Sequence, residues 1–438
     1  MPPRFPDLSP RPPGHPRRPR GWRAWVVRAV GVARAPAIRW AYAAMTRGLR
    51  IAGPLGAPWF LKMLGRPQWL FESQVAIPHR PIAVTAPRPR RAGDLELCGR
   101  IIDAYRLSRD GDGELSEIWS GHSARHHGDL DRALRSGDAA AVDEQLRWMF
   151  RRPFLSGIST PVDYEDRAAR DFWSLMAYDS LVSLAEAVGA IGAESPEQGA
   201  VGRAFGEGID GIPERIEAKL GISLDYPRVG APYGTLVGDR LIVRETGRHL
   251  HAAVRLHEVA ATQLAPRAAR DGARVVEIGA GFGGVAMWYL RMLGEAPGSY
   301  TIVDLPLMNA FQAYFLGGVH GGDALALDGE ADRQARIRIV APPAIAAGGV
   351  AADLVFNQDS LPEMTEGVAR GYLTWIAEQV DGVFVSCNHE AGTSGTVPQI
   401  VVCELADEIA GLQRLSRQPS WTRRGYVEEV YRCGATRR

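Results

Sequence analysis

The sequence predicts a mixed α/β protein in which a mostly parallel sheet follows a mostly helical region. From residue 273 onward, short β-branched apolar runs alternate with segments of helical periodicity, as in sheets built with crossover helices. Between residues 95 and 220, apolar side chains recur at helical spacing instead. A glycine-rich turn follows the first strand-like run, and nucleotide-binding α/β sheets open in this way.

Composition divides the 438 residues into three parts. Residues 1–93 form a basic extension and linker rich in proline and arginine, residues 94–222 a helical region, and residues 223–438 the sheet domain with its covering segment. The chain is long enough for two or three domains. The helical region and the sheet are therefore expected to be separate units.

The basic charge is concentrated at the start of the chain. Residues 1–71 hold 13 Arg or Lys and one acid, Asp7, whereas the remainder holds 38 basic and 49 acidic residues. The segment is compatible with a solvated extension, with Met45 as the true start, with a peripheral helix on an anionic membrane, or with a transit peptide. Trp and Arg together also suit nucleic acid, but no recognised motif supports this, so no nucleic-acid partner is expected.

Composition also indicates where the protein resides. Hydrophobic residues make up 46% and charged residues 23%, as in soluble globular proteins, and no run of eighteen apolar residues predicts a transmembrane segment. The cysteines show neither CxxC nor metal-site spacing, which predicts reduced thiols and a cytoplasmic location; they are Cys98, Cys387, Cys403 and Cys433. The oligomeric state is left open, with a homo-oligomer among the options.

Helices are predicted at 95–105, with Asp94 as the cap, and at 138–150, 163–192 and 199–220. The DGDGELS run resembles a calcium loop but places Ser108 at its first position and Trp119 at its twelfth, so it is interpreted as a polar loop. Turn-rich residues 224–244 are placed to cover a ligand. A helix at 246–264 carries His249, His251 and His257, whose spacing is not that of a metal site. No metal is therefore expected.

The sheet region is predicted element by element. Strands are expected at 275–278, 300–303, 336–340, 351–356, 383–386 and 425–432. Helices are expected after the glycine turn and at 305–316, 372–379 and 401–415. Because parallel strands end at one edge, the residues that follow them gather there.

The first strand and its turn predict a cofactor. Gly279, Gly281, Gly283 and Gly284 let a ligand approach the backbone, and Asp304 ends the next strand. The GxGxxG spacing also permits a dinucleotide such as NAD, or a turn that binds nothing. Glu277 before the turn would repel a pyrophosphate and attract a sulfonium and an amino group, which favours S-adenosyl-L-methionine, with Asp304 accepting from its ribose.

Polar residues follow the fourth and fifth strands at the same edge, namely Asn357, Asp359, Glu363, Asn388, His389 and Glu390. If S-adenosyl-L-methionine donates its methyl group to a hydroxyl, the hydroxyl is a weak nucleophile, and a general base must remove its proton during the attack on the methyl carbon. We expect His389 to be that base, because its pKa is near neutrality, and Asp359 to act directly or to orient it. Metal assistance is a lesser alternative, because no ligand spacing is present.

Five segments in order resemble the sugar O-methyltransferase family: 275–284, 300–306, 353–364, 384–390, and Trp421 with 425–431. The resemblance implies a Rossmann-like class I methyltransferase fold with an antiparallel last strand. It also implies donor binding by Glu277, Gly279, Gly281, Gly283 and Asp304, to which we add Leu305 and Asn357. Ala280 departs from the pattern but is small enough to fit. Residues 1–220 lie outside the resemblance.

The expected function is therefore S-adenosylmethionine-dependent O-methylation of a sugar hydroxyl on a glycan or glycosylated metabolite. The alternative enzyme function is methylation of a phenolic or other small-molecule hydroxyl. Enzymes of that kind also have a DLP segment after the second strand, as at residues 304–306 here, and a helical region before the sheet. The alternative that is not an enzyme is a non-catalytic cofactor-binding module, which recruits partners through the basic extension.

Overall fold

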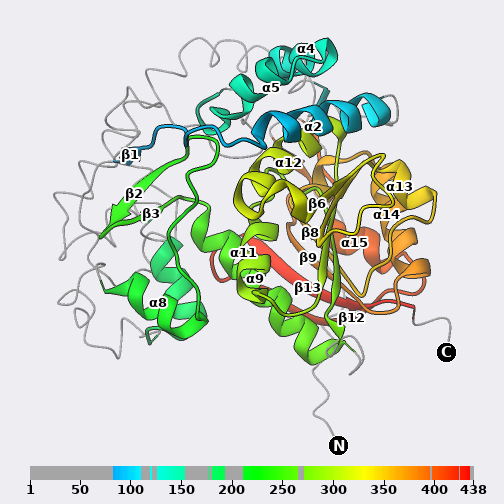
Figure 1. Ribbon diagram of the computed structural model, residues 1–438. Coiled ribbons are helices and arrows are strands. Elements are labelled where there is room, and N and C mark those ends of the chain that lie inside the picture. The colour runs from blue at the N-terminus through cyan, green and yellow to red at the C-terminus, as the bar shows by residue number, and fades with distance from the viewer. Residues whose placement is uncertain are drawn as a thin grey trace, which may run out of the picture.

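The chain forms the predicted mixed α/β fold around one mostly parallel eight-stranded sheet (Figure 1). The computed structural model describes residues 82–109, 119–120, 126–152, 177, 180–192, 211–264, 271–394, 397–423 and 425–434. The strand order is β12-β13-β9-β8-β4-β5-β7-β6. The strands are β4 (Arg274–Ile278), β5 (Ser299–Val303), β6 (Leu325–Leu327), β7 (Ile337–Val340), β8 (Leu354–Gln358), β9 (Val383–His389), β12 (Gln413–Pro419) and β13 (Tyr426–Arg432).

The strand pairing confirms the Rossmann-like class I methyltransferase arrangement. β4 lies at the centre and pairs in parallel with β5 on one side and β8 on the other. The last strand, β13, is antiparallel to both β9 and β12. Because the chain turns to opposite sides of β4, a crevice opens beyond the carboxyl ends of β4, β5 and β8.

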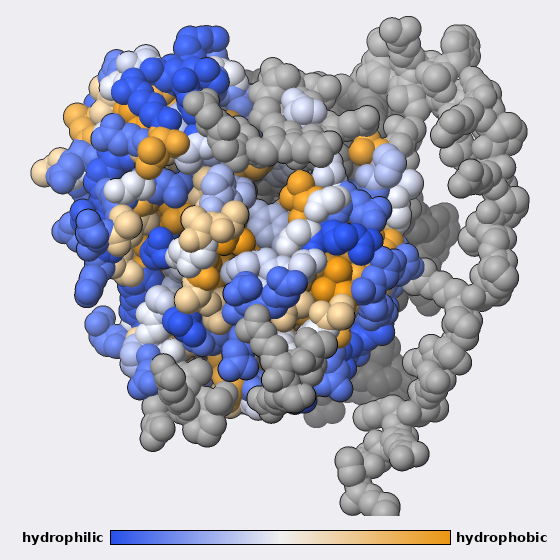
Figure 2. Space-filling view, turned by 90° about the vertical axis from the view of Figure 1, so that its right-hand side faces the viewer, coloured by the Kyte–Doolittle hydropathy of each residue, from blue (hydrophilic) through white to orange (hydrophobic). Residues whose placement is uncertain are grey.

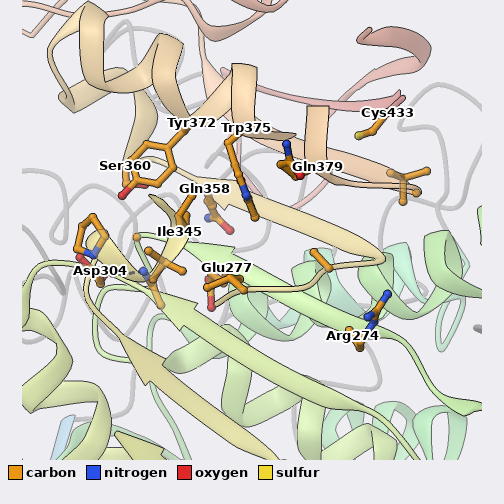
Figure 3. A pocket seen from close by; sticks show the side chains of 18 of the residues that line it. Arg274, Glu277, Asp304, Ile345, Gln358, Ser360, Tyr372, Trp375, Gln379 and Cys433 are labelled. Atoms are coloured by element: carbon orange, nitrogen blue, oxygen red, sulfur yellow. Dashed lines mark hydrogen bonds between the residues drawn. The ribbon is translucent and has the colours of Figure 1, made fainter. Parts of the chain in front are cut away.

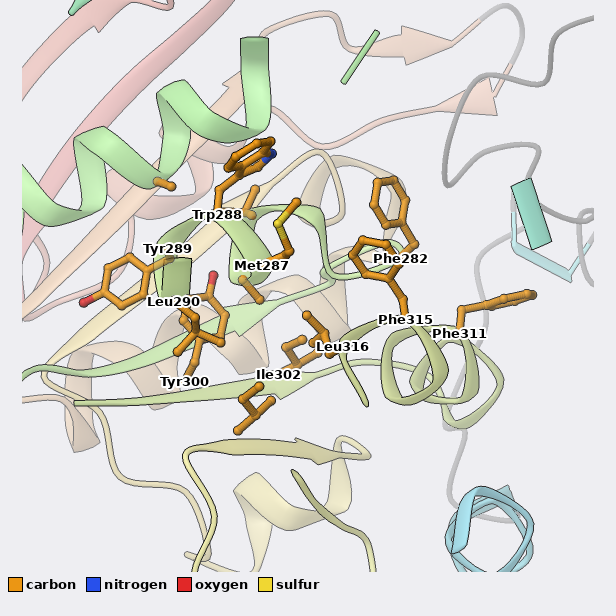
Figure 4. Packing of buried hydrophobic residues seen from close by; sticks show 14 of the residues in the cluster. Phe282, Met287, Trp288, Tyr289, Leu290, Tyr300, Ile302, Phe311, Phe315 and Leu316 are labelled. Atoms are coloured by element: carbon orange, nitrogen blue, oxygen red, sulfur yellow. The ribbon is translucent and has the colours of Figure 1, made fainter. Parts of the chain in front are cut away.

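Helices cover both faces of the sheet (Figure 1). One face carries α9 (Thr246–Gln263), α11 (Gly284–Leu293) and α12 (Pro306–His320), and the other carries α13 (Pro343–Ala346), α14 (Glu366–Gln379) and α15 (Val402–Asp407). The first face holds the larger core, where aromatic side chains of α11 and α12 meet Tyr300 and Ile302 of β5 (Figure 4). On the second face α13 is only four residues long, and hydrophobic side chains reach the surface among hydrophilic ones (Figure 2).

The region before the sheet is mostly helical, as predicted. It contains α2 (Asp94–Ser108), α4 (Gly128–Ser136), α5 (Ala139–Leu146), the 3₁₀ turn η4 (Met149–Arg151) and α8 (Ile212–Leu220). The Asp138 side chain caps α5 by accepting from Ala140 and Ala141. Asp94 does not cap α2 as predicted: it is the first helical residue, and it accepts from the Arg91 backbone and pairs with Arg88.

The structure also contains α4, β6 and α13, which were not predicted, and two predicted segments differ in type. The helix expected at 401–415 ends at Asp407, because the chain turns at Gly411, with φ of 98°, and continues as the strand β12. The turn-rich segment 224–244 contains a hairpin, β2 (Tyr233–Val237) and β3 (Arg240–Ile242), which pairs with β1 (Ile82–Val84). The DGDGELS loop, residues 1–81 and most of the helix expected at 163–192 lie outside the described residues.

For the predictions on membrane segments, metal sites and thiols, the structure gives evidence on the described residues only. No helix among them is long and apolar enough to cross a membrane. Nor does this part of the chain contain a group of three or more His, Cys, Asp or Glu side chains suited to a metal ion. All four cysteines are buried free thiols.

Candidate active site

A cavity of about 1780 Å³ opens at the carboxyl ends of β4, β5 and β8 (Figure 3). It continues along the sheet beneath α13 and α14, where Ile345, Tyr372 and Trp375 point into it, as far as Arg274 at the opposite edge. We call its carboxyl-edge part the rim cavity. Its polar lining comes from Arg248, His249, Glu277, Asp304, Gln358, Asp359, Ser360 and Glu363.

The glycine turn forms one wall of the rim cavity. Gly279, Gly281 and Gly283 all have positive φ, at 71°, 57° and 90°, a conformation that other residues adopt only with strain. A Cβ on Gly279 would lie 2.1 Å from Ser360 Oγ. The turn is therefore closely packed against the loop after β8, and of the three glycines Gly279 and Gly281 line the cavity.

Glu277 lies at the cavity with its side chain almost entirely buried. The Tyr300 hydroxyl donates to its carboxyl group at 2.9 Å. Burial raises the pKa of Glu277 to about 8; the Tyr300 hydrogen bond opposes this and nearby Asp304 adds to it. A cationic group in the cavity would offset the cost of ionising this carboxyl.

Asp304 follows β5 on the same wall. Its oxygens accept from Ala280 N at 2.9 Å, Leu305 N at 2.8 Å and Gln312 Nε2 at 2.6 Å. Burial raises the pKa of Asp304 to about 6, although these hydrogen bonds lower it. Each carboxylate oxygen has two acceptor sites, so one site remains for a hydroxyl donor from the cavity, on the oxygen that accepts from Leu305 N.

Of the two further cofactor-binding candidates, Leu305 lines the cavity and Asn357 does not. Asn357 is fully buried: its Nδ2 donates to Ile278 O at 2.8 Å, and its Oδ1 accepts from Asn388 at 3.0 Å. Asn388 in turn accepts from the backbone of Asp359. Asn357 is thus part of a chain of hydrogen bonds that fixes the ends of β4, β8 and β9 behind the cavity wall.

Asp359 lines the rim cavity in a strained conformation, with φ of 70°. Its carboxylate is paired with Arg423. Burial favours the neutral acid, but Arg423, a hydrogen bond from Tyr426 and nearby Arg248 together lower the pKa of Asp359. A carboxylate with a lowered pKa is a weak base, so this environment suits charge pairing better than proton transfer.

His389 is not among the described residues that line the cavity. Its Nδ1 accepts from the Ala391 backbone at 3.2 Å, which leaves the proton of the neutral ring on Nε2. Burial lowers its pKa, and Asp359 and Arg423 act on it in opposite directions. Its ring contacts the Tyr426 ring edge-on. The geometry therefore does not bring the predicted base to the site.

Glu363, from the segment after β8, also lines the rim cavity. Trp119 Nε1 donates to its carboxyl group at 3.0 Å. Burial and the neighbouring Asp359 raise the pKa of Glu363 to about 7, while Trp119 and Arg423 lower it. Glu363 is one of the polar residues predicted at the strand ends, but the sequence does not indicate the burial that raises its pKa.

Arg248 and His249 at the start of α9 complete the wall and were not predicted as site residues. His249 Nδ1 is buried and has no hydrogen-bond partner within the part of the chain that the structure describes. Burial, with Arg248 and Arg423 nearby, lowers the pKa of His249 well below its usual value, so the ring is neutral. Of the three histidines of α9, His249 lines the cavity, whereas His251 and His257 do not. Their spacing in the sequence argues against a metal site but does not indicate which of them faces a ligand.

No protein-family model matches the sequence, and no curated protein matches it. These comparisons therefore do not support the sugar-specific family. Similar solved structures include methyltransferases, and several of the similar structures have S-adenosylmethionine or S-adenosylhomocysteine bound.

Three of these structures illustrate the range. The 1,6-didemethyltoxoflavin-N1-methyltransferase of Burkholderia thailandensis is 20% identical, over 42% of this chain and 78% of its own, with a TM-score of 0.29. A family 2 O-methyltransferase of Planctomyces limnophilus, in complex with apigenin, is 11% identical over 80% and 98%, with a TM-score of 0.28. A mitomycin 7-O-methyltransferase is 13% identical over 78% and 95%, with a TM-score of 0.31. These values are too low to transfer a substrate or a residue's role.

Proposed function

We propose that this protein is an S-adenosylmethionine-dependent O-methyltransferase that acts on a hydroxyl of a small molecule. One observation carries the proposal: a single cavity joins a buried acid before a glycine turn, Glu277, and an acid after the next strand, Asp304, to a third carboxyl group, Glu363. The first two suit a cationic nucleoside, and the third suits proton removal from an acceptor.

The residues present fit the methyl donor. The positive-φ glycines bring bare backbone to the cavity, and Asp304 retains one acceptor site for a ribose hydroxyl. Among the described residues, no ion pair to Glu277 is present. When bound, S-adenosylmethionine supplies a methyl group on a positively charged sulfur. A dinucleotide would instead bring its pyrophosphate close to the buried Glu277 carboxyl, which would gain no attraction while protonated and would repel the pyrophosphate once ionised.

Glu363 is our proposed general base in place of His389. Its pKa near 7 lets it hold or release a proton at neutral pH, and it faces the cavity, whereas His389 does not. Glu277, Asp304 and the glycine turn would hold S-adenosylmethionine, which would supply the methyl group, and the Glu363 carboxylate would accept the proton of the acceptor hydroxyl. Asp359 holds Arg423 in place beside this position.

A sugar hydroxyl is the acceptor class that the five sequence segments favour, and a phenolic hydroxyl is the second candidate. Cytoplasmic location, a homo-oligomeric state and peripheral membrane contact through residues 1–71 remain proposals of the same origin. Deletion of residues 1–44 of the chain should leave turnover intact if this segment only tethers the enzyme.

Calorimetry on the full chain tests the donor. S-adenosylmethionine and S-adenosylhomocysteine should bind more tightly than NAD, and Glu277→Gln should weaken S-adenosylmethionine at least about tenfold, or 1.4 kcal/mol. Tighter binding of NAD, or no binding of the methyl donor, would exclude the proposal. Transfer of labelled methyl to a panel of neutral sugars, acidic sugars and phenols then identifies the acceptor class, and donor binding without transfer to any acceptor would favour the non-catalytic module.

A further inference from the structure

Arg248 lines the rim cavity and, together with Arg423, a second, smaller pocket, and Arg244 lies close enough to both for their charges to interact. Arg244 precedes α9, Arg248 lies in its first turn, and Arg423 comes from the segment between β12 and β13. Their charges act on one another: burial, together with Arg248 and Arg423, lowers the pKa of Arg244 to about 10, although Glu245 opposes this. Burying like charges together is costly unless anions compensate for them.

The carboxylates nearby are already engaged. Asp359 is paired with Arg423, whose guanidinium also lies over the Tyr426 ring at 3.6 Å. Glu245, a further acid near the cluster, lies 3.6 Å from Arg248, which is within ion-pair range but beyond hydrogen-bonding distance. His249 adds no charge, because its ring is neutral.

Arg248 is the least satisfied member of the cluster. Its Nε is buried without a partner, and within the described residues no hydrogen bond to its guanidinium is found. The side chain keeps 18% of its surface exposed and lines the rim cavity. Its position in the first turn of the eighteen-residue α9 adds the positive potential of a helix N-terminus.

We infer that Arg248, with Arg423 and Arg244 beside it, forms an oxyanion subsite of the rim cavity that binds a carboxylate or phosphate group of the methyl acceptor. Guanidinium groups bind both kinds of oxyanion through paired N–H donors. The inference rests on the proposed function, since it assigns the acceptor's charge. It narrows the substrate class to anionic hydroxyl compounds, such as an acidic or phosphorylated sugar, over neutral ones.

Thermal unfolding of the full chain with S-adenosylhomocysteine tests the subsite. Sodium phosphate and sodium acetate are compared with sodium chloride at constant ionic strength. One of the two anions should raise the midpoint by at least about 2 °C in the wild type. The phosphate arm identifies a phosphoryl group, and the acetate arm identifies a carboxylate.

Three variants separate the subsite from general salt effects. Arg248→Met should lose the anion-specific rise, and Arg248→Lys, which keeps the charge without the paired donors, should retain part of it. Arg370→Met removes an exposed arginine on α14 that is paired with Glu366 and Glu408, and it should retain the rise in full.

Equal midpoints in all three salts for the wild type, or an equal rise in Arg248→Met, would overturn the inference. Calorimetry with S-adenosylhomocysteine on the same preparations separates the two proposals. Failure of donor binding with a preserved anion effect rejects the methyltransferase function and keeps the subsite. Intact donor binding without an anion effect does the reverse, and intact donor binding by Arg248→Met shows that this variant is folded.

Discussion

At the scale of single residues, burial and the charges of neighbouring groups together decide which carboxyl groups can exchange protons. Asp359 and Glu363 both line the rim cavity and lie four positions apart in sequence. Although Asp359 is buried, its pairing with Arg423 lowers its pKa. Burial and the negative charge of Asp359 raise the pKa of Glu363 to about 7. Sequence analysis could identify both acids but could not assign their roles.

We predict that Glu363→Gln lowers kcat by about 10²–10⁴-fold, the usual contribution of a general base. The wild-type kcat/KM should rise as pH increases through about 7, because only the deprotonated carboxylate of the free enzyme accepts the hydroxyl proton. Steady-state kinetics over pH 5.5–9 with the identified acceptor measures both effects. His389→Gln is the control and should keep most of the activity; a reversal of the two results would restore His389 as the base.

Glu277 predicts a proton linked to donor binding. Its pKa of about 8 in the free protein means that it is mostly protonated at pH 7, and a bound cation favours the carboxylate. Binding of S-adenosylmethionine should therefore release up to one proton near pH 7, and this release should vanish above about pH 9. Calorimetry in buffers of different ionisation enthalpy measures it, and Glu277→Gln should abolish it.

The same group has a consequence for stability without ligand. Because the pKa of Glu277 is raised on folding, from an ordinary value of 4.5 to about 8, its contribution is most favourable below pH 4.5 and is lost as pH rises toward 8. Glu277→Gln should therefore flatten that part of the pH dependence of the free energy of unfolding. An unchanged slope in the variant would contradict the assignment.

At the scale of elements, the sequence predicted those strands whose burial is regular. β4, β5 and β8 are buried on both faces and appear as continuous apolar runs. β12 has no such signal, because it is an edge strand with nearly every side chain exposed. Its arginines, Arg414 and Arg417, instead reach across to Glu429 on β13, a pairing that periodicity does not detect.

The glycine turn gives the element-scale prediction. Gly279→Ala should destabilise the protein by the strain of a left-handed alanine, about 1–2 kcal/mol, and by a clash with Ser360. Gly221→Ala is a matched control, because Gly221 also has φ of 71° but has no atom within 4 Å of an added Cβ. Urea unfolding should show the larger loss for Gly279→Ala. Only this variant should also weaken S-adenosylmethionine, and equal effects of the two variants would show that the turn is not closely packed.

At the scale of the whole molecule, the helical region and the sheet share one hydrophobic core. Leu97 of α2 lies against Gly317 of α12, where an added Cβ would be 2.6 Å from it. Arg100 of α2 forms a two-point ion pair with Glu330, at 2.6 and 2.7 Å. The sequence indicated a boundary near residue 222, since composition changes there, but which surfaces two regions bury against each other is not encoded in local periodicity.

We therefore predict that the helical region and the sheet unfold together. Leu97→Ala removes a side chain that is only 5% exposed and should lower the free energy of unfolding by about 2–5 kcal/mol. Leu107→Ala, on the same helix but at a side chain 66% exposed, should change it little. Urea unfolding followed by tryptophan fluorescence and by far-ultraviolet circular dichroism should give one coincident transition for each protein. Two separated transitions, with only the first moved by Leu97→Ala, would instead show that the helical region folds independently and covers the sheet without stabilising it.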